Sequence, residues 1–127
     1  MKVALDTNAY SDFARGDESR LAIVQTASHL FMPFVVLGEL RAGFAFGKQA
    51  ASNEAVLQKF LASPRVVSLW ADDMTTRHYA ALITQLKKQG RMIPTNDIWI
   101  AALALQHGLT LCTSDTHFQY LPQISRC

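Results

Sequence analysis

Short apolar runs alternate with longer stretches in which apolar residues recur at helical spacing. The runs at residues 3–5, 30–32, 66–69 and 109–113 have strand length and predict buried strands. Helices are predicted at residues 8–14, 17–27, 34–46, 52–61, 72–89 and 95–107. Because one or two helices separate consecutive strands, we predict an α/β fold whose parallel sheet is covered on both faces.

Residues that typically cap helices or occur at sheet edges refine the predicted bounds of the helices and strands. Asn8 or Ser11 is suited to cap the first helix, and Thr95 or Asn96 to cap the last one. A short apolar piece with a proline at residues 118–124 predicts an edge strand. We therefore expect a mostly parallel sheet of four to five strands.

Composition narrows the class of protein. The 127 residues fit one domain, 1–127, and 50% of them are hydrophobic while only 17% are charged. That balance predicts a large core or an apolar interface, and hence self-association. A net charge of +2 does not by itself indicate a nucleic-acid partner.

Features of secreted and membrane proteins are missing. Cys112 and Cys127 have neither metal-binding nor disulfide spacing, which favours a reducing cytoplasm. The first apolar run is interrupted by Asp6 before a signal peptide forms, and no run approaches the roughly 20 residues of a membrane span. We expect a cytoplasmic protein with no membrane partner.

Acidic residues occur where strands end or the following helices begin. Asp6 and Asp115 follow the first and fourth strands, Asp97 lies in the first turn of the last helix, and Glu39 interrupts the apolar helix 34–46. In a parallel sheet these positions share one rim, where ligands bind. Clustered carboxylates repel each other and require a cation. Oxygen ligands alone favour Mg²⁺ or Mn²⁺.

Ordinary structural roles remain open for the same residues. Asp97 favours the helix dipole, Asp115 suits a turn, and Glu39 can pair with Arg41 or Arg15. The neighbouring polar residues either orient carboxylates and waters or act only as caps and turns. These neighbours are Thr7, Asn8, Asn96 and Ser114.

A metal ion at such a rim suits one kind of chemistry. It activates a water as nucleophile and neutralises the oxygens of a phosphodiester, and two ions about 3.5–4 Å apart would serve both the attacking and the leaving oxygen. Phosphodiester hydrolysis is therefore the reaction that this set of acids predicts.

Four sequence motifs, in order, resemble one known family. They are Leu-Asp-Thr-Asn at 5–8, Gly-Glu-Leu-Arg-Ala-Gly at 38–43, Asn-Asp-Ile-Trp-Ile-Ala-Ala at 96–102 and Thr-Ser-Asp-Thr-His-Phe at 113–118. Together they resemble the PIN-domain ribonucleases, specifically the VapC toxins of bacterial toxin–antitoxin pairs, over essentially the whole chain. The resemblance implies a three-layer α/β/α fold and a metal-dependent endoribonuclease. Its catalytic and metal-binding residues would be Asp6, Glu39, Asp97 and Asp115.

Partners follow from the same resemblance. It implies an RNA substrate and a homodimer that assembles further with a VapB-like antitoxin. The antitoxin's tail would cover the active site, and its other end would provide the only contact with DNA. Two groups of basic residues either follow an RNA backbone or are ordinary solvated charges. They are Arg15, Arg41 and Lys48, and Lys87, Lys88 and Arg91.

Other functions make different demands on the sequence. A receiver domain needs an acidic pair after the first strand, and a haloacid-dehalogenase-type phosphatase needs an aspartate where Asn8 stands. A metal-free ribonuclease would use histidines, but His29, His78, His107 and His117 share no common spacing. A catalytically silent binding module that holds a partner's basic tail on the acidic rim remains the alternative to an enzyme.

Overall fold

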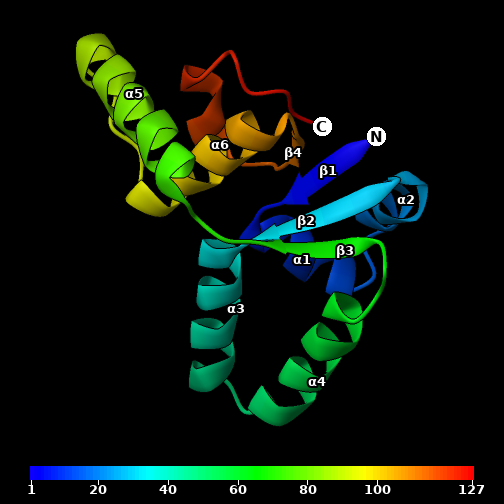
Figure 1. The fold of residues 1–127 in the computed structure, drawn as a ribbon. Helices are drawn as coiled ribbons and strands as arrows, with labels where there is room; N and C mark the ends of the chain where they lie inside the picture. The colour runs from blue at the N-terminus through cyan, green and yellow to red at the C-terminus, as the bar shows by residue number, and fades with distance from the viewer.

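A four-stranded parallel sheet forms the centre of the protein, whose computed structural model describes all residues 1–127. The strands lie in the order β3-β2-β1-β4 (Figure 1). Their bounds are Lys2–Leu5 for β1, His29–Pro33 for β2, Val66–Leu69 for β3 and Thr110–Cys112 for β4. All pairings are parallel, as predicted from the alternation of strands and helices.

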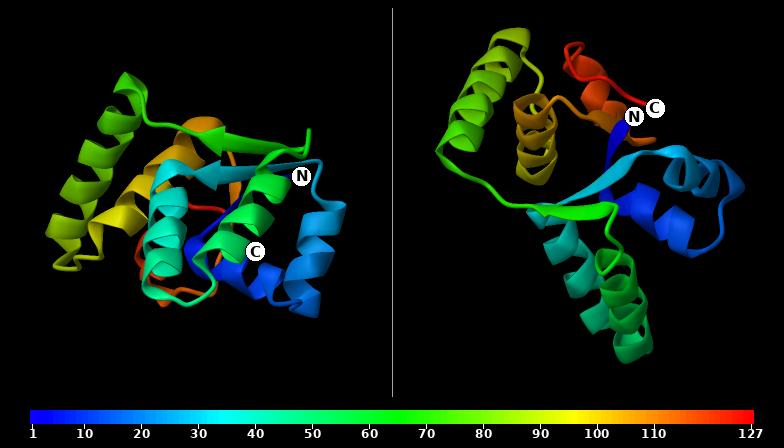
Figure 2. Two further views of the ribbon diagram at one scale, coloured as in Figure 1. Left: turned by 90° about the horizontal axis from the view of Figure 1, so that it is seen from below. Right: turned by 45° about the vertical axis from the view of Figure 1, so that its right-hand side comes forward.

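Helices cover both faces of this sheet and give three layers. The chain moves from β1 to β2 to β3 in one direction and then returns past β1 to β4. Because parallel crossovers are right-handed, the reversal places α5 and α6 on the face opposite the first helices; Figures 1 and 2 show this separation. The helices are α1 (Thr7–Ala14), α2 (Glu18–Thr26), α3 (Phe34–Phe46), α4 (Ala50–Leu61), α5 (Asp73–Gln89) and α6 (Thr95–His107).

The core lies against β1 and α6. Three of the four residues of β1 are buried, and α6 buries Ile98 and the run 100–104. The near-absence of polar side chains along α6 is typical of a helix surrounded by protein, and its burial agrees with this. Burial of both elements fixes the positions of Asp6 and Asp97, which adjoin them.

Two predicted helix caps are wrong. Asp6, not Asn8 or Ser11, is the N-cap of α1, where its side chain accepts a hydrogen bond from the backbone N–H of Ala9. Pro94 precedes α6 with no side-chain cap, so neither Thr95 nor Asn96 has that role. Pro94 lies in extended backbone and leads the chain directly into the helix.

The predicted edge strand at residues 118–124 is also wrong. Residues Thr116–Tyr120 form a short 3-10 helix, η1, which Asp115 caps through the backbone N–H of His117. The chain reaches the sheet edge only afterwards, where Arg126 forms a parallel bridge with Leu111 of β4. None of the helices has the length and apolarity needed to cross a bilayer.

Candidate active site

A small polar cleft opens at the carboxyl ends of β1 and β4. The two strands are parallel neighbours, and the chain adds β2 and β3 on one side of β1 but β4 on the other side. Open α/β sheets bind ligands at such a change in strand order. The cleft has a volume of about 140 Å³. Its lining residues are Asp6, Thr7, Asn8, Glu39, Asp97, Ile100 and Asp115. The four acids expected at one rim therefore meet in one cleft.

Asp6 is the most buried of these acids, with 6% of its surface exposed. Its Oδ1 accepts the backbone N–H of Ala9 at 2.8 Å, and its Oδ2 accepts the hydroxyl of Thr113. Burial raises the pKa of the Asp6 carboxyl above its usual value, because the charged form loses hydration. Asp6 thus directly follows β1, caps α1 and faces the cleft in one fixed orientation.

Glu39 lies on the exposed side of α3, although the helix is otherwise largely apolar. Its Oε1 accepts the hydroxyl of Thr7 at 2.7 Å, which joins α3 to the start of α1. Arg41 and Arg15, the cations considered for it, pair instead with Glu54 at 3.1 Å and Asp12 at 2.7 Å. Glu39 is therefore free of a basic partner and turned to the cleft.

His117 lies between two of the acids. Its Nδ1 is 2.8 Å from Oδ2 of Asp97 and 3.0 Å from Oδ1 of Asp115. The contact with Asp97 raises the pKa of His117. Burial raises the pKa of Asp97 more strongly than the hydrogen bond with His117 lowers it. In its protonated form the imidazole partly neutralises two carboxylates that otherwise repel each other.

Three residues at this site were missed by the sequence analysis. Thr113 joins two acids, because its hydroxyl donates to Asp6 and accepts the backbone N–H of Asp115 at 2.9 Å. Arg20 of α2 donates to Ser114 Oγ, and its charge lowers the pKa of Asp6 to a smaller extent than burial raises it. His117 contacts two of the acids, although its spacing from the other histidines predicts no shared site. The motif at 113–118 contained Thr113 and His117, but only the folded sheet shows what each contacts.

The residues expected to orient carboxylates or waters divide into two groups. Thr7 and Asn8 line the cleft, and Thr7 holds Glu39. Ser114 is bound by Arg20 and lies outside the cleft lining. Asn96 lines a neighbouring hollow of about 400 Å³, which shares Glu39 with the cleft. Only Thr7 is hydrogen-bonded to one of the acids.

The basic residues considered for RNA binding are dispersed. Arg15 and Arg41 are engaged by acids of their own or a neighbouring helix. Arg91 lies over the ring of Tyr120, with its guanidinium carbon 5.1 Å from the ring centroid. Lys48, Lys87 and Lys88 are exposed. RNA contact by any of these six residues stays a prediction.

The donor atoms of the cleft fit a divalent cation. Asp97, Asp115 and His117 each offer one ligand atom, and these atoms lie within 4.8 Å of one another. Asp6 and Glu39 bring further carboxylates to the same cleft. Carboxylate oxygens dominate this set of ligand atoms, which suits Mg²⁺ and Mn²⁺, and no thiolate lines the cleft.

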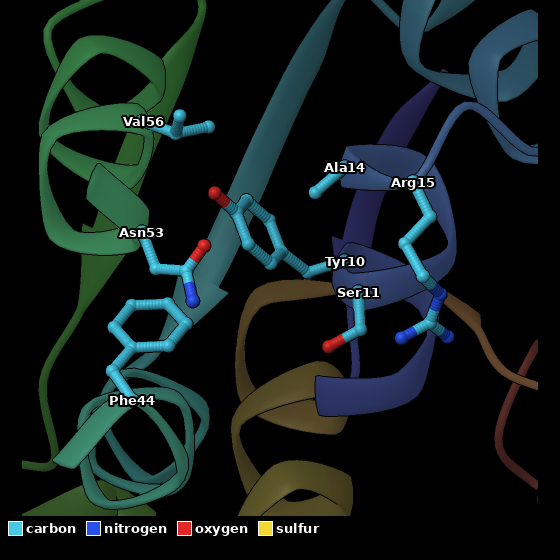
Figure 3. Close-up of a pocket in the computed structure, with 7 residues that line it drawn as sticks. All are labelled: Tyr10, Ser11, Ala14, Arg15, Phe44, Asn53 and Val56. Atoms are coloured by element: carbon cyan, nitrogen blue, oxygen red, sulfur yellow. The ribbon is translucent and has the colours of Figure 1, made fainter. Parts of the chain in front are cut away.

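A third hollow, of about 260 Å³ and less polar than the cleft, lies between α1, α3 and α4. Figure 3 shows Tyr10 reaching from α1 toward α4, with Phe44 of α3 and Asn53 of α4 on the opposite side. Val56, at the α4 border, is 54% exposed. This groove presents apolar surface to solvent on the face that carries α1–α4.

Comparison with known proteins places the chain in a family. The model of the PIN domain matches residues 3–123. Ribonuclease VapC4 of Mycobacterium tuberculosis is 34% identical over 92 residues, which are 71% of this chain and 69% of the relative. VapBC2 of Rickettsia felis, solved with a DNA fragment from the promoter, has a TM-score of 0.88 at 25% identity, covering 100% of this chain and 98% of that one. VapBC-5 of M. tuberculosis, from the VapBC family of toxin–antitoxin systems, has a TM-score of 0.73 at 28% identity, with coverages of 99% and 98%. The chain therefore belongs to the PIN-domain family.

Proposed function

We propose that this protein is a metal-dependent endoribonuclease and the toxin of a toxin–antitoxin pair. One observation supports this most: Asp6, Glu39, Asp97 and Asp115 line one cleft, and no arginine or lysine forms a salt bridge with any of them. The similarity to a VapC ribonuclease gives the class of reaction, and the cytoplasm is the compartment that supplies RNA.

The catalytic and metal-binding residues that we propose are these four acids. Asp97 and Asp115 would hold the ion together, and Asp6 and Glu39 would complete its surroundings. Mg²⁺ or Mn²⁺ supplies a Lewis acid that lowers the pKa of a water and neutralises charge on the phosphodiester. The chain's own groups fix the carboxylates: Thr113 and the Ala9 N–H hold Asp6, and Thr7 holds Glu39.

Cleavage of RNA by the purified chain tests this function. Cleavage should require Mg²⁺ or Mn²⁺, stop with chelator and leave 5′-phosphate and 3′-hydroxyl ends. Asp97→Asn should abolish cleavage while the protein stays folded. Asp73→Asn is the matched control, because Asp73 is an exposed acid that pairs with Arg77 on α5. Cleavage that survives chelator, or 2′,3′-cyclic phosphate ends, would point to histidine chemistry instead.

The alternative function, a catalytically silent binding module, predicts a different effect of these substitutions on toxicity. If the acidic rim only holds a partner's basic tail, Asp6→Asn and Asp97→Asn would leave toxicity in growing cells unchanged. Loss of toxicity from variants that retain their fold and abundance supports the enzyme. Cleavage sites mapped in total RNA after brief induction would then identify the substrate.

We also propose an antitoxin as protein partner, with DNA bound only through it, and a homodimer of this chain. Support comes from VapBC2 and VapBC-5, which match over nearly the whole chain. The groove in Figure 3 offers an apolar segment of the antitoxin a place between α1 and α4. Val56→Asp should weaken a co-purified complex, because a charge at this exposed border opposes apolar docking. An exposed alanine of α5 changed to aspartate, Ala81→Asp, serves as the control.

A further inference from the structure

The two cysteines, 15 residues apart in sequence, come together at the edge of the sheet. Leu111 of β4 and Arg126 form a parallel bridge: the N–H of Leu111 donates to Ser125 O at 2.7 Å, and the N–H of Cys127 donates to Leu111 O at 2.9 Å. The N–H of Thr113 continues the ladder to Cys127 O at 3.3 Å. Cys112 and Cys127 are therefore the next residues in register.

This register is compatible with a disulfide between the two cysteines. Residues opposite each other on neighbouring strands point to the same face, and their strands are about 4.8 Å apart, within the Cα spacing that disulfides bridge. The two thiols also lie close enough to interact. Their spacing in the sequence gave no sign of this, because only the bridge at Leu111 brings the two segments together.

The two thiols differ in their exposure to solvent. Cys112 is fully buried, and its Sγ accepts a hydrogen bond from Arg20 Nη1 at 3.0 Å. Cys127 is exposed. An oxidant in solution reaches Cys127 first, and Cys112 lies beside it as the second thiol.

We propose that Cys112 and Cys127 form an oxidation site that closes into an intramolecular disulfide and ties the end of the described chain to β4. With a peroxide, the Cys127 sulfur attacks the O–O bond, giving a sulfenic acid and one water. The Cys112 sulfur then attacks the Cys127 sulfur, the S–O bond breaks, and hydroxide leaves with the Cys112 proton as a second water. The two thiols lose two electrons and the peroxide gains them.

The cross-link acts on the segment that borders the cleft. Cys112 O accepts the backbone N–H of Asp6 at 3.3 Å, and the following residue, Thr113, donates to the Asp6 carboxylate. Arg20 holds both Cys112 and Ser114 from α2. A disulfide here fixes the sheet edge beside Asp6, and it does so whether or not the protein cuts RNA.

Intact mass after mild oxidation tests the proposal. The reduced full chain is treated with one equivalent of hydrogen peroxide, unfolded and alkylated with a maleimide. We expect a mass lower by two hydrogen atoms, no alkylated cysteine, one cross-linked peptide pair, and full reversal by a thiol reductant. Cys127→Ser should keep one alkylatable thiol and form no cross-link. Because Cys127 is exposed, this variant should fold normally.

Thermal unfolding supplies the second readout. The oxidised chain should melt on the order of 5 °C above the reduced chain, because a closed loop restricts the unfolded state, and Cys127→Ser should show no shift with peroxide. Over-oxidation of Cys127 to sulfinic acid with Cys112 still alkylatable, or a disulfide only between two chains, would overturn the proposal.

Discussion

The hydroxyl of Thr7 donates a hydrogen bond to Oε1 of Glu39 at 2.7 Å, although the two residues are 32 positions apart. This bond holds an otherwise exposed carboxylate of α3 against the start of α1, beside Asp6. A long, exposed glutamate loses considerable side-chain freedom when it is fixed in this way. Thr7 therefore orients Glu39 toward the cleft.

Thr7→Val should lower the RNA cleavage rate because Glu39 loses its hydrogen-bond donor. Loss of such a supporting bond reduces activity or metal affinity by roughly 10- to 100-fold. Thr7→Ser keeps the hydroxyl and should retain most of the rate. Initial rates at saturating Mn²⁺ check this, and equal rates for the valine and serine variants would show that Thr7 has no orienting role.

Asp6 is both the N-cap of α1 and a carboxylate of the cleft, and two different substitutions separate these roles. Asp6→Asn keeps the acceptor for the Ala9 N–H, loses the acceptor for the Thr113 hydroxyl and removes a charge whose burial raises the pKa of the carboxyl. We expect its free energy of unfolding, measured without metal, to equal or exceed that of the parent chain. Asp6→Ala loses the cap of α1 and should be less stable by about 1 kcal/mol. Both variants should be inactive on RNA. Urea unfolding measures the first effect, and an unstable Asp6→Asn variant would contradict it.

Without metal, stability should depend on pH through His117. Its contact with Asp97 raises its pKa above the unfolded value of 6.5. The folded state therefore binds the proton more tightly, so this stabilisation is fully present below about pH 6.5 and is lost as pH rises through the raised folded pKa. The raised pKa values of Asp6 and Asp97 act with the same sign at lower pH.

Thermal melts in chelator between pH 6 and 8 measure this dependence. The melting temperature should fall as pH rises, and His117→Gln should flatten the curve. His29→Gln is the matched control, because His29 is exposed at the amino end of β2, whereas the cleft lies at the carboxyl ends of the strands. A parent chain that melts at higher temperature at pH 8 than at pH 6 would refute the sign.

Thr75 offers a stability test away from the cleft. Its side chain is fully buried, donates to Gln106 Oε1 and accepts the backbone N–H of Asp72 at 3.0 Å. Thr75→Val should reduce the free energy of unfolding by about 0.5–1.5 kcal/mol, since it removes the hydrogen bonds to the backbone N–H of Asp72 and to Gln106. RNA cleavage well below the melting temperature should not change, and Thr75→Ser should restore most of the stability. A neutral valine variant in urea unfolding would contradict this.

The local pattern of residues was sufficient to predict most helices and strands of the fold. Helix α3 and strand β3 have the predicted bounds, because Pro33 and Gly47 flank the helix and Pro64 precedes the strand. The strand ends gave the positions of Asp6 and Asp115, and parallel pairing brought them together. These features depend on residues close in sequence, whose preferences are readable without the fold.

Contacts between distant segments were not readable in this way. The predicted edge strand at 118–124 failed because Asp115 caps a 3-10 turn first, and the chain pairs with β4 only at Arg126. His117, Thr113 and Arg20 acquire their roles from neighbours 20, 107 and 94 positions away, respectively. The exposed position of Glu39 likewise depends on which side of α3 packs against the sheet.

Anomalous diffraction from crystals soaked in Mn²⁺ tests the central claim most directly, because it locates the ion itself. We predict a manganese peak within coordination distance of Asp97 and Asp115, with Asp6 and Glu39 facing the same ion, and no such peak in Asp97→Asn crystals. A cleft that stays free of manganese at a saturating concentration, or manganese bound only outside it, would contradict the account.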